Sequence, residues 1–163
     1  MLEIGFNALH TSGKDLRLPI SVSVIPELQV VHNVYTGRVT IQDLYDEQTK
    51  RHQNPAFEMG MPGINDLSQV TEVDIGFDEM MAYAKQTTET YRDVTEPIQL
   101  VLVGETPITA AAMAMYENLS AASNAPFEVT VVPGYPEVLA LLNLPAAGLA
   151  YFPDFCRKES HLF

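Results

Sequence analysis

Hydrophobic and polar positions follow a period of two in several short segments, which predicts strands. The alternation along Ile20–Ile25 indicates a strand with one face toward water, and the turn after it makes the next strand its hairpin partner. Ile98–Val103 is almost continuously apolar, as strands in the middle of a parallel sheet are. The predicted strands are residues Ile20–Ile25, Leu28–Tyr35, Leu67–Val70, Ile98–Val103 and Phe127–Val132.

Between these strands the apolar positions recur at helical spacing. Thr40 is a good N-cap for a helix that fades at Asn54, because proline follows that residue. A second amphipathic helix begins near Phe77, after a tight connection. A third is predicted to open at Thr106, which can cap a helix with proline in its first turn. The last helix spans 136–142.

Strands that alternate with helices of this length predict parallel pairing. The element order is ββαβαβαβα, so the fold class is α/β. We expect a single layered domain with a mostly parallel five-stranded sheet and an antiparallel edge hairpin strand. The domain is predicted to span 20–144, between an N-terminal extension of residues 1–19 and an aromatic C-terminal tail of residues 145–163.

Composition narrows the function classes. The chain has 163 residues, of which 47% are hydrophobic and 18% charged, as in an ordinary globular domain. A formal charge of −12 disfavours nucleic acid and anionic membrane surfaces as partners. No apolar run reaches the ~20 residues of a membrane span, and no signal peptide is visible at the start, so we expect a cytoplasmic protein. The single cysteine fits a reducing compartment.

Polar side chains near the predicted third strand are the first candidate site. Asp66, Ser68 and Asp74 lie where ligands of open α/β sheets bind. The simpler interpretation is that they hydrogen-bond loop backbone and stabilise the coming helix, and we favour it. Gly104 and Thr106 follow the central strand and could offer backbone N–H groups to an anion, although a plain capped turn is the better interpretation.

The aromatic tail is the second candidate. Five apolar side chains in it are too many to leave in water without consequence. The tail either folds back over its own domain or crosses to a second subunit or covers a ligand groove, and the sequence leaves these alternatives open. The five residues are Tyr151, Phe152, Phe155, Leu162 and Phe163.

The element order, and the string from Asp66 through Leu67, Ser68 and Val70 to Asp74, resemble the STAS domain of anti-sigma-factor antagonists. Within that family the chain is most similar to an uncharacterised bacterial STAS-like branch. The stretches 54–57 and 136–142 carry this closer resemblance, which covers about residues 20–143. It implies a β–α layer fold of the SpoIIAA-like type and a binding or regulatory role.

One departure from the STAS pattern removes a function. Antagonists that switch by phosphorylation carry a serine after the aspartate at the head of the helix, whereas Ile75 follows Asp74 here. Phosphorylation adds about −1.5 to −2 charges at such a place and can release a partner. Because isoleucine cannot receive a phosphate, the phosphorylation switch is predicted to be lost.

Three functional hypotheses follow. The first is a non-enzymatic, dimeric protein-interaction module whose partner meets the helix after Asp74 or the aromatic tail. The second is a carrier or sensor of a small hydrophobic ligand. The third is a small enzyme that uses His32, Asp66 and Asp74. We favour the first, with no cofactor, no metal site and no catalytic residue, and with Cys156 as an ordinary thiol.

Overall fold

The computed structural model describes residues 19–158, except for the side chains of 157 and 158. One five-stranded sheet runs through these residues in the order β1-β2-β3-β4-β5. β1 pairs with β2 in antiparallel fashion, and the other neighbours are parallel, which confirms the predicted fold class. The strands are β1 (Ile20–Ile25), β2 (Val30–Thr40), β3 (Gly63–Asp74), β4 (Ile98–Val103) and β5 (Phe127–Val132).

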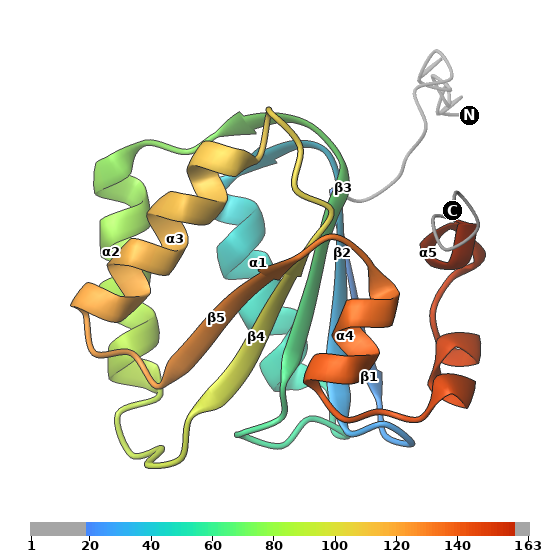
Figure 1. The fold of residues 1–163 in the computed structure, drawn as a ribbon. Coiled ribbons are helices and arrows are strands. Elements are labelled where there is room, and N and C mark those ends of the chain that lie inside the picture. The colour runs from blue at the N-terminus through green and yellow to red at the C-terminus, as the bar shows by residue number, and fades with distance from the viewer. Residues whose placement is uncertain (1–18, 159–163) are drawn as a thin grey trace, which may run out of the picture.

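Helices cover the sheet on both faces (Figure 1). One face carries α1, α2 and α3, and the other carries α4, the short 3₁₀ helix η1 and α5. Their bounds are α1 (Ile41–Gln53), α2 (Phe77–Thr90), α3 (Ala110–Ala122), α4 (Tyr135–Leu141), η1 (Ala146–Tyr151) and α5 (Asp154–Lys158). None of the described helices combines the length and apolar character needed to cross a bilayer.

Local sequence explains the start of α1. The Thr40 backbone N–H donates to the Asp43 carboxylate at 2.7 Å, so the predicted cap is present. The start of α3 differs from prediction. The regular helix begins at Ala110 rather than just after Thr106, and Thr109 at the N-cap position makes no side-chain cap hydrogen bond. Thr106 still opens a turn before the helix, because its carbonyl accepts from the Ala110 N–H at 2.9 Å and its own N–H donates to Thr109 Oγ1. Ile108, in the turn before the helix, is half exposed.

Two strands are longer than their sequences indicate. β2 continues to Thr40 instead of ending at Tyr35, and β3 spans Gly63–Asp74 instead of Leu67–Val70. The two strands pair with each other from Val31 with Gly63 to Thr40 with Asp74, with register shifts between Val34 and Thr36 and between Gly37 and Arg38. The local sequence of these polar and glycine-containing segments indicates a loop, but backbone pairing keeps them extended.

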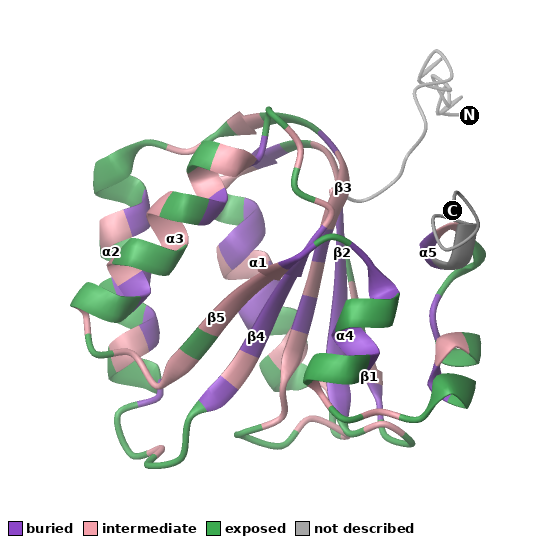
Figure 2. Cartoon of the chain, viewed as in Figure 1, coloured by how far each residue is buried: buried purple, intermediate pink, exposed green. Residues whose placement is uncertain are grey.

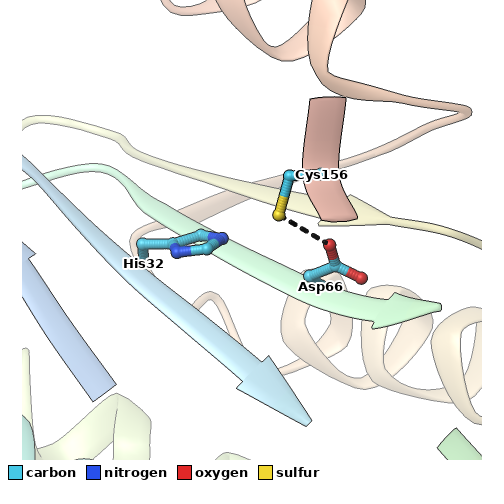
Figure 3. A group of neighbouring side chains, drawn as sticks. All are labelled: His32, Asp66 and Cys156. Atoms are coloured by element: carbon cyan, nitrogen blue, oxygen red, sulfur yellow. Dashed lines mark hydrogen bonds between the residues drawn. The ribbon is translucent and has the colours of Figure 1, made fainter. Parts of the chain in front are cut away.

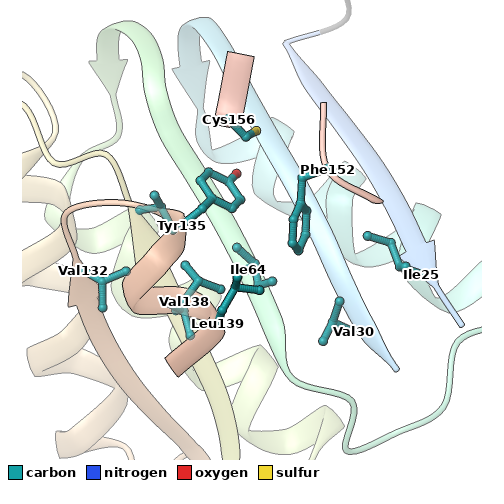
Figure 4. Close-up of a cluster of buried hydrophobic side chains, with 11 residues drawn as sticks. Ile25, Val30, Ile64, Val132, Tyr135, Val138, Leu139, Phe152 and Cys156 are labelled. Atoms are coloured by element: carbon teal, nitrogen blue, oxygen red, sulfur yellow. The ribbon is translucent and has the colours of Figure 1, made fainter. Parts of the chain in front are cut away.

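The buried residues lie on both faces of the sheet, as Figure 2 shows by colour. On the face of α4 and α5 they form one cluster that includes Phe152 and Cys156 from the C-terminal segment (Figure 4). The described part of the aromatic tail thus packs on its own sheet. The predicted N-terminal extension, apart from residue 19, and Leu162 and Phe163 lie outside the described residues.

Candidate functional site

The two faces of the sheet hold two different sites, because neighbouring residues of a strand point to opposite faces. In β2, His32 points to the face of α4 and α5, while Asn33 reaches the α1 side chain Glu47 on the other face. In β3, Asp66 and Asn65 divide in the same way. We describe the α4 and α5 face first.

Four buried side chains from four elements meet on this face: His32, Asp66, Tyr135 and Cys156, which we call the tail-face cluster. The Tyr135 hydroxyl donates to Asp66 Oδ2 at 2.7 Å and lies 2.8 Å from His32 Nε2. Cys156 Sγ donates to the same Asp66 oxygen at 3.8 Å (Figure 3). The other carboxylate oxygen accepts from the Ser68 backbone N–H and hydroxyl at 2.9 and 2.6 Å. The buried carboxylate is therefore well supplied with donors.

Burial controls the protonation of this cluster. It lowers the pKa of His32 to about 4, although the nearby Asp66 carboxylate opposes the change. Burial also raises the pKa of Tyr135, and Asp66 raises it further. At neutral pH the imidazole and the phenol are consequently both neutral, and the phenol serves as a hydrogen-bond bridge between His32 and Asp66.

His32, Asp66 and Cys156 are also residue types that bind zinc, and their ligand atoms lie within 4.8 Å of one another. The space between the imidazole and the carboxylate is taken, however. The Tyr135 oxygen is at hydrogen-bond distance from both groups, so an ion shared by them would have to displace it. The geometry fits a closed hydrogen-bonded cluster that joins the C-terminal segment to the sheet better than it fits a metal centre.

The structure divides the predicted catalytic trio. His32 and Asp66 lie together, whereas Asp74 is exposed and forms an ion pair with Arg38. Asp66 pairs with Val34 of β2 and Asp74 with Thr40, six residues farther along, which corresponds to roughly 20 Å. The predicted set of Asp66, Ser68 and Asp74 fails for the same reason, since only its first two members touch.

The other predicted site residues are scattered. Gly104 lies against Ser68: with φ at +80°, a Cβ on Gly104 would be 2.6 Å from Ser68 Cβ. Thr106 is engaged with Thr109 at the start of α3. In the tail, Phe152 is 2% exposed and Phe155 partly buried, while Tyr151 is 49% exposed. Ile75 lines the cavity described next.

The opposite face contains a cavity of about 90 Å³ between the sheet and α1, α2 and α3, partly open to solvent. Most of its lining is apolar, with Val70 and Val73 from β3 and Met80 and Met113 from the helices. The sequence does not distinguish these four residues as a site, because the pattern around each predicts an ordinary core position. Only the amphipathic helix faces hinted at an apolar space beneath them.

Polar residues gather in one part of the cavity wall. Glu47 and Arg51 of α1 form an ion pair in which the two side chains are 3% and 14% exposed. Asn33, behind the wall, donates to Glu47 Oε1 at 2.9 Å and to Asn65 Oδ1 at 2.8 Å. Burial raises the pKa of Glu47, although Arg51 opposes the change. We call Tyr35, Glu47, Arg51 and Asn65 the polar end of the cavity.

No known protein-family model matches this chain, and no curated protein sequence does either. The resemblance to STAS domains therefore stays a prediction.

Proposed function

We propose that this protein is a non-enzymatic binding protein for a small, mostly apolar molecule, which it holds in the cavity between the sheet and α1, α2 and α3. The observation that carries the proposal is the cavity itself. Ligand sites are concave and mostly apolar, with few polar groups that fix orientation. Val70, Val73, Met80 and Met113 supply the apolar wall here, and the polar end supplies the orienting groups.

The cavity limits the size of the ligand. About 90 Å³ is less than the roughly 150 Å³ of an engineered protein cavity that binds benzene. A ligand enclosed here without widening of the cavity has about four to six non-hydrogen atoms. We expect weak binding for such a ligand, because affinity is bounded by about −1.5 kcal/mol per non-hydrogen atom.

The tail-face cluster supports a binding role over an enzymatic one. Its titratable residues are the described groups most like a catalytic set, yet Phe152 and the C-terminal segment cover them. They lie on the face of the sheet away from the cavity. A protein-interaction role at Asp74 or the tail also stays a prediction, and burial of Phe152 reduces the apolar surface that the tail offers to a partner.

A pair of α3 variants tests the proposal. Ala112 lines the cavity, and its neighbour Ala111 is exposed. We expect Ala112→Leu to abolish binding of 1-butanol and Ala111→Leu to leave it unchanged. Methyl NMR of Met80 and Met113 measures the binding at millimolar ligand and also shows whether each variant keeps its fold.

Two results would contradict the proposal. One is the absence of any ligand-dependent shift at Met80 or Met113 in the unmodified protein. The other is equal binding by Ala112→Leu, in a folded variant whose cavity is filled, since this would place the ligand elsewhere.

A further inference from the structure

The polar end of the cavity contains an acceptor without a donor. Glu47 is 2% exposed, and its Oε1 atom accepts hydrogen bonds from Asn33 and Arg51. No described residue donates to its Oε2 atom. The fully enclosed atoms without a partner are two others, Asn33 Oδ1 and Arg51 Nε. Glu47 lines the cavity and its side chain is 3% exposed, so the cavity is the open space next to this carboxylate.

Two other residues of the polar end also keep unused hydrogen-bonding capacity. The Tyr35 hydroxyl has no hydrogen-bond partner in the described part of the chain, and Asn65 uses only its carbonyl oxygen, which accepts from Asn33. Asn33 bonds Glu47 and Asn65 through one amide nitrogen and so holds them side by side. A ligand group at this end therefore meets an acceptor, a hydroxyl and an amide donor together.

Charge selects among the groups that could fill this place. The Glu47–Arg51 pair is neutral as a whole, and an ion transferred from water into a mostly apolar cavity loses its hydration. A carboxylate would in addition face Glu47, and an ammonium group would compete with Arg51. A neutral hydroxyl can donate to Glu47 Oε2 and accept from Tyr35 or Asn65 at the same time.

We infer that the ligand is a small neutral alcohol, whose hydroxyl group donates to Glu47 Oε2 while its apolar part lies against Val70, Val73 and Met80. This inference rests on the proposed function, because it concerns the same cavity. It adds the chemical class of the ligand and the residue that recognises it.

A matched series of ligands tests the inference on the unmodified protein. The probes are 1-butanol, its isomer methyl propyl ether, butyrate and butylammonium. The ether has the same atoms as the alcohol, but its oxygen cannot donate. We expect 1-butanol to bind about tenfold more tightly than the ether, the effect of one hydrogen bond to a charged acceptor, and both ions to bind more weakly than the alcohol.

Variants locate the effect. Glu47→Gln should reduce the preference for the alcohol over the ether, because it removes the charged acceptor to which only the alcohol can donate. Tyr35→Phe should weaken the binding of both ligands, because either oxygen can accept from the Tyr35 hydroxyl, whereas Tyr45→Phe should change neither, because Tyr45 does not line the cavity. Tyr35→Phe removes only one oxygen atom, so it remains informative if Glu47→Gln does not fold.

The outcomes separate the two proposals. Equal binding of alcohol and ether, or tighter binding of either ion, overturns the alcohol assignment but leaves the proposed cavity function intact. Failure of all four probes to shift Met80 and Met113 contradicts the cavity function itself. An unchanged preference in folded Glu47→Gln overturns Glu47 as the recognition residue.

Discussion

The buried imidazole of His32 should make the stability of the protein depend on pH in a predictable direction. Folding places this side chain at 3% exposure between Tyr135 and Phe152, with ring centroids 5.9 and 4.9 Å away. The charge of Asp66 raises the pKa of His32, but it only partly offsets the lowering caused by burial. The folded state therefore favours the neutral imidazole.

The sign and size follow from linkage. Burial lowers the pKa of His32 from 6.5 to about 4, so below pH 6.5 the unfolded chain binds a proton that the folded chain does not. Stability from this group is fully present above pH 6.5 and is lost as the pH falls through about 4. At about 1.4 kcal/mol for each pH unit, the interval from 6.5 to about 4 corresponds to roughly 3 kcal/mol.

Urea unfolding followed by circular dichroism measures this loss at pH 7, 5.5 and 4. The control is His32→Gln, whose side-chain amide can still donate to the Tyr135 hydroxyl but does not titrate. We expect the unmodified protein to lose about 3 kcal/mol more than the variant between pH 7 and pH 4. Parallel pH profiles, or a His32 pKa near 6.5 by NMR titration, would refute the reasoning.

Two further substitutions test packing, each with a matched control and urea unfolding as the measurement. Gly104→Ala places a Cβ 2.6 Å from Ser68 Cβ, whereas Gly60→Ala has the same kind of positive φ and nothing within 4 Å, so the first should cost about 1–3 kcal/mol more than the second; equal costs would mean that only backbone strain matters. Phe152→Ala should cost about 3–5 kcal/mol, and Tyr151→Ala less than about 0.5; a small loss for Phe152 would show that the C-terminal segment is not docked as described.

Sequence patterns predicted those elements whose secondary structure is determined by their own residues. β4 is continuously apolar and appears with its predicted bounds, Ile98–Val103. The helix predicted to begin near Phe77 begins there. Local sequence failed to predict secondary structure where pairing with a distant segment determines it. Gly63–Asn65 is such a case: it follows a proline-containing loop, but it pairs with both β2 and β4. The sequence around such a segment carries no pattern that indicates this pairing.

The candidate sites were harder to predict for the same reason. His32 and Asp66 are visible in the sequence as polar residues in strands, but the group that joins them, Tyr135, lies 69 residues beyond Asp66. Cys156 reads as an ordinary thiol until the C-terminal segment packs on the sheet. Glu47 looks like an ordinary acidic helix residue in the sequence. Its burial by the neighbouring layers makes it unusual, and its position in α1 does not indicate that burial.

The alternation of β2 and β3 also explains why the two sites can coexist. His32 and Asp66 fix one face of the sheet to the C-terminal segment, and their hydrogen bonds use the polar atoms that a buried cluster has to satisfy. The residues next to them, Asn33 and Asn65, face the cavity side, where Asn33 donates to both Asn65 and Glu47. The α4 and α5 face therefore gives the strands a closed, hydrogen-bonded support, while the cavity face keeps an oxygen of Glu47 without a donor. One face is thus filled by a closed cluster, whereas the other keeps a mostly apolar cavity with a polar end, and this is why we place the function on the cavity face.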